Sequence, residues 1–131
     1  MADRNTQVAL DRFTWRMLSQ QVSQWEFDGL KQRIERWDQW CEEWSKVAAQ
    51  HAATGDKAAK EGHALTAGGA YIRAALYYHW ANFLFVHDQK QFVGAMLAMD
   101  ECWKKAAPLV DPPMELRASG QMSACHHPEG E

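Results

Sequence analysis

The stretch TAGGAYIRAALYYHWANFLFVH, residues 66–87, is the most aromatic part of the chain and decides the fold expected for it. Apolar or small residues recur there three and four positions apart, the spacing of one buried helix face. They are Leu65, Gly69, Ile72, Leu76, Trp80, Phe83 and Val86. Further aromatic and His side chains lie off that stripe: Tyr77, Tyr78, His79, Phe85 and His87. One buried side cannot accommodate them all, so a second surface, such as another domain, would explain them.

Two helices are predicted before this stretch. The first spans residues 8–22, where Leu10, Phe13, Met17, Leu18 and Val22 recur at helical spacing. The second begins near Asp28-Gly29 and should stop near Gly55, a good C-cap residue. Its apolar positions alternate four and three apart, the seam of an antiparallel helix pair: Leu30, Ile34, Trp37, Cys41, Trp44 and Ala48.

Small residues are expected to let the helices approach closely. Gly68 and Gly69 predict tight packing on the tryptophan-rich helix of residues 37–44, although Thr66 could instead cap a fresh helix and introduce a kink.

A fourth helix begins near Phe92 and should end before Pro108, because proline cannot donate a backbone hydrogen bond.

The predicted fold is all-α, about four helices in an up-and-down antiparallel bundle with a short extended C-terminal tail. Residues 1–113 form the helical domain, and Asp111-Pro112-Pro113 marks its boundary. Residues 114–131 have no helical period and indicate a β-hairpin around Ser119-Gly120.

Composition excludes several classes of function. The 131 residues carry a net charge of -3 without a basic patch, which argues against nucleic-acid binding. Three Cys without framework spacing favour a reduced chain, and the charged start of the sequence does not resemble a signal peptide. The most apolar window, residues 71–86, is too short to span a membrane. We therefore expect a soluble cytoplasmic protein.

Three segments in this order resemble a known family: the Trp37, Trp40 and Trp44 helix, then RAALYYHWA, then the pattern A-P-x-x-x-P-P at residues 107–113. Together they resemble the N-terminal helical region of α/β-hydrolases of the 2,6-dihydroxypseudooxynicotine hydrolase type, also described as dipeptidyl aminopeptidase/acylaminoacyl peptidase-like. The similarity covers about residues 25–113. It implies a helical lid and pocket wall beside a catalytic domain that supplies a Ser nucleophile, an acid and a His to hydrolyse an ester, amide or carbon–carbon bond.

One departure from the family bears on chemistry. A nucleophile elbow requires Gly-x-Ser-x-Gly, and these 131 residues contain no such pentapeptide. We therefore expect no catalytic residue here and an inactive chain, either a truncated product or a fragment. The resemblance implies a catalytic domain as its partner, and the tail would be that domain's first hairpin. Self-association through the aromatic helix is the alternative.

Four residues are candidates for the substrate pocket or the domain interface: Arg73, Tyr77, Tyr78 and His79. Each has an ordinary structural alternative. His79 could be a packed histidine satisfied by a neighbour, Arg73 a solvated side chain, and either tyrosine an interface ring.

No cofactor or metal site is predicted. Cys125-His126-His127 suggests zinc, but a structural zinc site needs four ligands, and neither Cys41 nor Cys102 is suitably spaced. The competing function is a stand-alone helical interaction module, against which no 34-residue repeat is visible.

Overall fold

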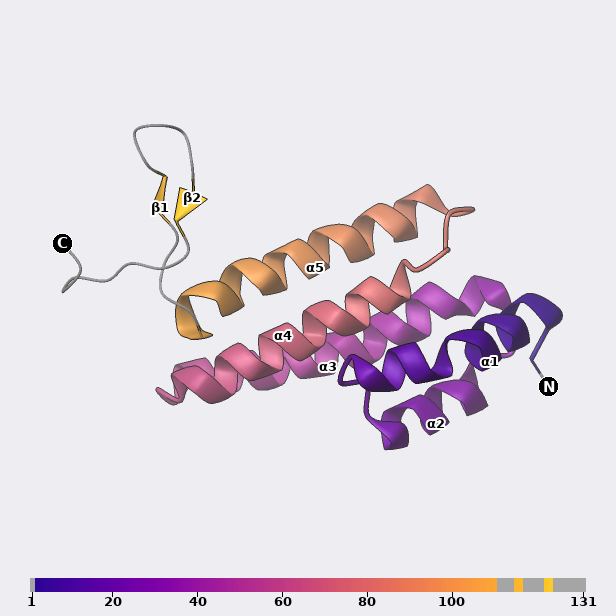
Figure 1. Ribbon diagram of the computed structural model, residues 1–131, viewed down its shortest axis with the longest axis horizontal. Helices are drawn as coiled ribbons and strands as arrows, with labels where there is room; N and C mark the ends of the chain where they lie inside the picture. Colours follow the sequence, from indigo (N-terminus) through magenta and orange to yellow (C-terminus); the bar gives the residue numbers. More distant parts are fainter. Residues whose placement is uncertain (1, 111–114, 117–121, 124–131) are drawn as a thin grey trace.

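The computed structural model describes residues 2–110, 115–116 and 122–123 (Figure 1). The all-α class is confirmed, with five α-helices in place of the expected four. These are α1 (Arg4–Ser19), α2 (Gln24–Arg33), α3 (Trp40–Lys60), α4 (Ala64–Ala81) and α5 (Gln89–Val110), with a 3-10 turn, η1 (Trp37–Gln39), between α2 and α3.

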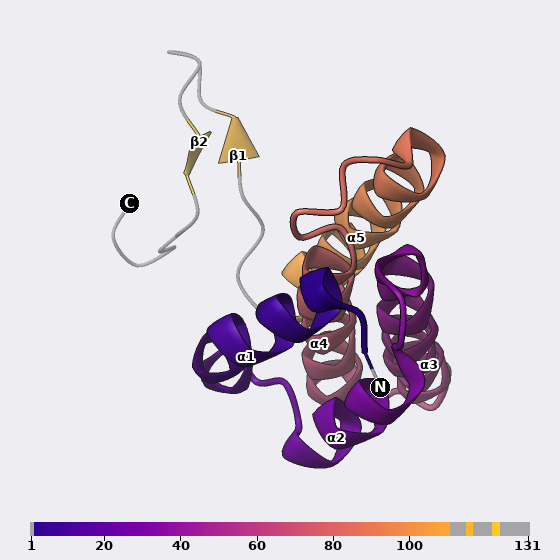
Figure 2. The ribbon, with the colours of Figure 1, turned by 90° about the vertical axis from the view of Figure 1, so that its right-hand side faces the viewer.

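The long helices α3, α4 and α5 form the body of the molecule. They lie alongside one another with α4 in the middle, while α1 and α2 cover one end (Figures 1 and 2). The two sides of α4 pack along α3 and α5, and α3 and α5 touch each other much less. The same chain therefore covers part of what was expected to need a second surface: Tyr77 and Phe85 are fully buried, while His79 and His87 remain exposed.

The single helix predicted from Leu30 to Gly55 is wrong, because the chain breaks after Arg33. Ile34 leaves the helix in an extended conformation, with φ −89° and ψ 102°. The side chain of Gln39 accepts hydrogen bonds from the N–H groups of Glu35 and Arg36, both at 3.0 Å. These contacts satisfy backbone donors that the continuing helix would have used.

The N-terminus of the chain also holds this break in place. The Asp3 carboxylate accepts from Thr6 N at 2.9 Å and from Trp37 N at 3.0 Å, so one side chain caps α1 and anchors η1. Asp3 N donates to Glu35 O at 2.7 Å. The pairing is between residues more than thirty positions apart, which local periodicity cannot reveal.

Two predicted helix ends are also wrong. Helix α3 passes through Gly55 to Lys60 and is followed by Gly62, whose φ of +81° is the left-handed conformation typical of a helix terminus. Helix α5 retains Pro108, which stands two residues before its last residue and so interrupts only the final turn.

The expected close packing by Gly68 and Gly69 also differs from the structure. A Cβ at Gly68 would overlap Val110 Cγ1, at the end of α5, and a Cβ at Gly69 would meet nothing within 4 Å. The close approach of α3 to α4 occurs instead at Gly55, where a Cβ would lie 2.7 Å from Tyr71 Cε1.

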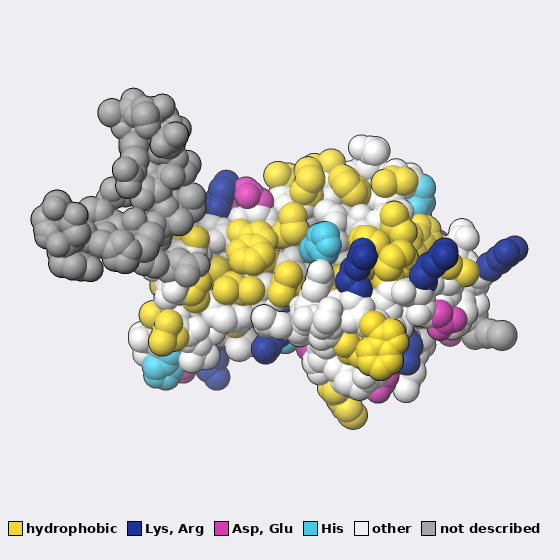
Figure 3. Space-filling view, viewed as in Figure 1, with side chains coloured by type: hydrophobic (Ala, Val, Ile, Leu, Met, Phe, Trp, Pro, Cys, Tyr) yellow, Lys and Arg dark blue, Asp and Glu magenta, His cyan; other side chains and the backbone are white. Residues whose placement is uncertain are grey.

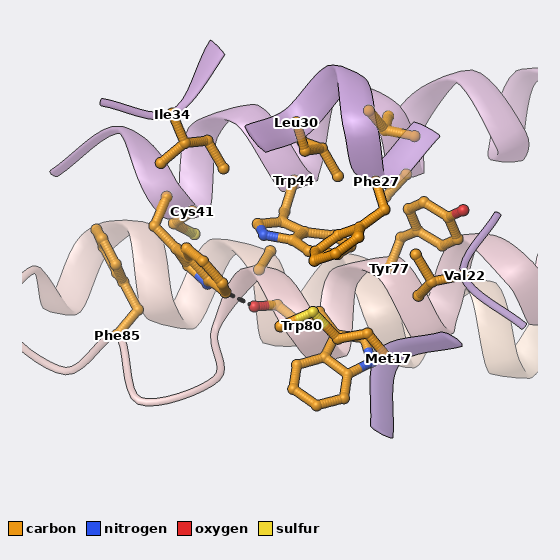
Figure 4. Close-up of a cluster of buried hydrophobic side chains, with 14 of the residues drawn as sticks. Met17, Val22, Phe27, Leu30, Ile34, Cys41, Trp44, Tyr77, Trp80 and Phe85 are labelled. Atoms are coloured by element: carbon orange, nitrogen blue, oxygen red, sulfur yellow. Dashed lines mark hydrogen bonds between the residues drawn. The ribbon is translucent and has the colours of Figure 1, made fainter. Parts of the chain in front are cut away.

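Aromatic rings fill the main core (Figure 4). Trp40, Trp44, Tyr77, Trp80 and Phe85 are fully buried, and the indole Nε1 of Trp40 donates to the carbonyl of Trp80 at 2.7 Å. Each such ring contributes on the order of 2–3 kcal/mol by leaving water. This core ties α3 to the end of α4.

In the tail, β1 (Glu115–Leu116) pairs antiparallel with β2 (Met122–Ser123), in the register Glu115 with Ser123. The remaining tail residues, with the predicted Ser119-Gly120 turn and Cys125-His126-His127, lie outside the described residues.

Candidate functional site

Of the stripe that the sequence predicted to be buried, Trp80 is fully buried, while the other residues lie on the outward side of α4 or beyond its end. Leu65 is 76% exposed and Val86, beyond the helix, is 64% exposed. Gly69 is exposed, while Ile72, Leu76 and Phe83 are half-buried. The buried side is instead made of small and aromatic residues: Ala67, Gly68, Ala70, Tyr71, Ala74, Ala75, Tyr77, Trp80 and Ala81. Alanines allow α3 and α5 to approach closely, and the larger aliphatic side chains are left facing out.

A similar stripe runs along α5. Phe92, Met96, Met99 and Trp103 follow one another at helical spacing, and Met96 and Trp103 are 40% and 42% exposed. Apolar side chains spread over α4 and α5 in the view where both helices face the reader (Figure 3). We call the outward residues Ile72, Leu76, His79, Phe83, Met96, Met99 and Trp103 the α4–α5 apolar surface.

Of the four predicted site residues, Tyr77 lies deepest. It is fully buried, its hydroxyl donates to Glu26 Oε1, and it accepts a hydrogen bond of 2.9 Å from Ser23 N. His51 Nε2 lies 2.9 Å from Glu26 Oε2, and its ring centroid is 4.9 Å from that of Tyr77. Burial and the bond to Glu26 raise the pKa of Tyr77 well above its usual value. The hydroxyl therefore joins α2, α3 and α4 inside the bundle and is not free to meet a ligand.

Sequence reasoning missed the partners of Tyr77. Glu26 and His51 stand 51 and 26 positions before it and belong to different helices, so no local motif connects them. The signal available was only that a Tyr in a buried helix needs a polar partner.

Tyr78 lies half-buried next to Tyr77, about 100° further round α4. Its ring packs in the cluster of Ala74, Ala75 and Cys102, and burial raises its pKa. It also lines a groove of about 500 Å³ between α3 and α5, together with Cys41 and Gln91. The Cys41 thiol donates to the Gln91 carbonyl at 3.6 Å, so the thiol is already engaged within the fold.

His79 and Arg73 are exposed on α4. The His79 ring contacts Trp80 and Phe83, with centroids 5.5 Å and 6.3 Å apart, and burial against them lowers its pKa below the usual value. His79 is thus a neutral imidazole at neutral pH within the α4–α5 apolar surface. The four predicted residues do not share one accessible surface, since Tyr77 is fully buried, Tyr78 is half-buried, and Arg73 and His79 are exposed.

A wider groove of about 840 Å³ lies between α2 and α3. Its charges are already paired, since Glu43 contacts both Arg33 Nε and Lys46 Nζ at 3.0 Å. Across residues 2–110 no three His, Cys, Asp or Glu side chains converge as metal ligands. No helix of the described part is both long and apolar enough to cross a bilayer.

Comparison with known proteins identifies relatives over part of the chain. It is 34% identical over 74 residues to the α/β-hydrolase pydG of Acremonium sp, and 33% identical over 76 residues to the 2,6-dihydropseudooxynicotine hydrolase of Paenarthrobacter nicotinovorans. The resemblance to α/β-hydrolases is confirmed. The α/β-hydrolase xenA of Xenoacremonium sinensis is 28% identical over 74 residues.

These matches cover 56–58% of this chain but only 17–20% of each relative, so the chain spans about a fifth of the length of the hydrolases that it matches. No protein-family model matches the chain, and no solved structure matches it.

Proposed function

We propose that this helical bundle is the lid and substrate-pocket wall of an α/β-hydrolase that cleaves an ester, amide or carbon–carbon bond. The observation that carries the proposal is the α4–α5 apolar surface, found on a chain whose relatives are α/β-hydrolases. Isolated apolar side chains on a protein surface are ordinary, but a contiguous apolar patch marks a docking site.

Docking on a catalytic domain accounts for the distribution of apolar residues. On α5, Trp103 and Met96 present large side chains to solvent. On α4, the half-buried side chains of Leu76 and Phe83 belong to the same surface. Covering them releases about 25 cal/mol for each Å² of apolar surface removed from water. A covered pocket also excludes water from the reacting centre and positions the substrate.

His79 and Arg73 are the polar residues that such a wall offers to a substrate or to the domain junction. The neutral imidazole of His79 can donate or accept a hydrogen bond at the edge of the apolar surface, and Arg73 can pair with a carboxylate. In this proposal Tyr78 packs behind the wall as a half-buried ring, and the hydrogen bonds of the Tyr77 hydroxyl fix α4 against α2.

In this proposal the partner provides the chemistry. Acyl transfer needs a nucleophile, a base and oxyanion donors, and the chain has no Gly-x-Ser-x-Gly pentapeptide to supply the nucleophile. The purified chain incubated with p-nitrophenyl acetate should show no turnover above buffer. Saturable hydrolysis that a serine-directed inhibitor abolishes would overturn the lid assignment.

Self-association is the competing use of the α4–α5 apolar surface. Sedimentation velocity distinguishes the two, because a docking surface for another domain leaves the chain monomeric at low micromolar concentration. A stable dimer that Trp103→Asp dissociates would favour self-association.

A further inference from the structure

Three arginines stand along one side of α1: Arg4, Arg12 and Arg16. In the segment 2–110 none of them forms an ion pair, whereas several of the basic residues on other helices do: Lys31, Arg33, Lys46 and Lys104. Helix α1 has these three arginines against a single aspartate, Asp11, an excess of two positive charges in a chain of net charge -3. At 1.5 Å per residue the row is about 18 Å long.

The nearby carboxylates are engaged in the fold. Both Asp3 oxygens accept backbone N–H groups, and Asp11 Oδ1 accepts from Gln7 Nε2 at 2.9 Å. Basic side chains stand out beside apolar ones in this region of the surface (Figure 3). The row of arginines therefore presents positive charge to whatever approaches α1.

An apolar groove of about 390 Å³ adjoins the row, between α1 and the connection from α4 to α5. Its lining includes Arg4, Val8, Arg12, Phe13, Trp37 and Leu84. Val8 is 47% exposed and Leu84 is 58% exposed, so the groove has an apolar floor open to solvent and a basic rim.

The backbone at Leu84 is unusual. Its φ of +59° lies in the left-handed region that leucine rarely occupies, and its side chain faces solvent, while the next residue, Phe85, is fully buried. Glycine or asparagine would adopt this conformation more readily. A strained residue that holds an apolar side chain in the open is expected where that side chain serves binding.

We propose that this α1 groove binds an amphipathic segment of a partner protein, about a dozen residues long. Its apolar side chains lie on Val8, Phe13 and Leu84, and its carboxylates pair with the three arginines. Apolar anchors at helical spacing flanked by charges are a common mode of peptide recognition. We favour a peptide because the apolar floor is a groove of about 390 Å³, which takes up individual side chains; nucleic acid and anionic membranes are the alternatives that the test separates. The α1 groove adjoins the α4–α5 apolar surface, since the Phe13 and Phe83 rings meet edge to face with centroids 4.8 Å apart, but its occupant is argued without the lid proposal.

The probe is a fluorescent 14-residue peptide with leucines at positions 2, 6, 9 and 13 and flanking glutamates, compared with the same peptide carrying glutamines. We expect saturable binding in an anisotropy titration, about tenfold tighter for the glutamate peptide and weaker in high salt. Amide shifts should cluster at Val8, Phe13 and Leu84. Equal binding of the two peptides, or no binding of either, would overturn the proposal.

Matched variants locate the site. Arg4→Gln, Arg12→Gln and Arg16→Gln together should weaken binding about tenfold. The same loss of charge through Lys57→Gln, Lys60→Gln and Lys90→Gln should leave it unchanged. Circular dichroism checks that both triple variants fold.

Leu84→Asn provides a second readout. It should raise the urea midpoint for unfolding of the free chain and weaken the binding of the peptide. A single-stranded oligonucleotide or phosphatidylglycerol vesicles that bind more tightly than the peptide, through the same arginines, would contradict a protein partner.

Discussion

The hydroxyl of Tyr77 lies where three helices meet and has both a donor and an acceptor role there. Tyr77→Phe leaves the Ser23 N–H without that acceptor and the Glu26 carboxylate without one donor. We expect a loss of about 1–2 kcal/mol in the free energy of unfolding, measured by urea denaturation.

Tyr78→Phe is the matched control for this prediction. The hydroxyl of Tyr78 makes no hydrogen bond to the part of the chain that the structure describes, and the ring is half-buried as a hydrophobic group. The change should cost less than about 0.5 kcal/mol. Equal losses in both variants would show that the hydroxyl of Tyr77 has no special role.

Two tyrosines also predict how stability depends on alkaline pH. The pKa of Tyr71 is raised from 10.0 to about 12, mainly by the hydrogen bond to Asp56 and to a smaller extent by burial. The pKa of Tyr77 rises further. Because the folded pKa exceeds the unfolded one, the stability that these hydroxyls contribute is complete below pH 10 and is lost as pH rises through the folded pKa.

Urea titrations at pH 9, 10 and 11 measure this loss. The free energy of unfolding should fall by up to about 1.4 kcal/mol per pH unit for each tyrosine. The fall should be shallower in Tyr71→Phe and Tyr77→Phe, while lysine deprotonation contributes equally to all three proteins. Parallel curves for wild type and variants would exclude the assignment.

At the residue scale the sequence predicted that Tyr77, Tyr78 and Trp80 belong to one aromatic helix, and that helix exists. It placed Trp80 on the buried side, as the structure has it, but placed Tyr77 off that side, although Tyr77 is fully buried. The burial of Tyr77 depends on Glu26 and His51, which reach Tyr77 only after α2 and α3 have packed.

At the scale of helices, Gly55 and Gly69 should respond oppositely to alanine. A Cβ at Gly55 would lie 2.7 Å from the Tyr71 ring, so Gly55→Ala should destabilise the bundle by about 1–3 kcal/mol despite the better helix propensity. Gly69 has open space around its Cα, and Gly69→Ala should stabilise by about 0.5–1 kcal/mol. Thermal denaturation of both variants tests this, and a destabilised Gly69→Ala would contradict the packing described for α4.

The helices themselves could be predicted from periodicity, because apolar spacing survives even where a boundary is misplaced. The break between α2 and α3 could not. Leu30 and Trp44 keep a continuous seven-residue pattern across it, and the break depends on Asp3 and Gln39, polar residues outside that pattern.

The prediction that Leu65, Ile72 and Leu76 face the core was wrong for a related reason. Periodicity shows that Leu65, Ile72 and Leu76 share a side of the helix but does not say whether that side faces the core. The alanine-rich side faces the core because it lets two helices pack closely against α4.

At the scale of the whole molecule, the resemblance to α/β-hydrolases gave a more specific functional prediction than the individual residues did. The motif order indicated an α/β-hydrolase, and the matches confirm that relationship over somewhat more than half of the chain. The lid role is a proposal that depends on what covers the α4–α5 apolar surface.

A graft tests that proposal most directly. In the graft, residues 2–110 replace the segment that they match in the Paenarthrobacter nicotinovorans hydrolase. Turnover of 2,6-dihydropseudooxynicotine is measured for the graft, for the graft with Trp103→Asp, and for the graft with the exposed control Lys60→Asp. We predict measurable hydrolysis in the first and third proteins and at least about a tenfold lower kcat/KM in the second. Undiminished hydrolysis in the Trp103→Asp graft, or none in the unmodified graft, would contradict the account.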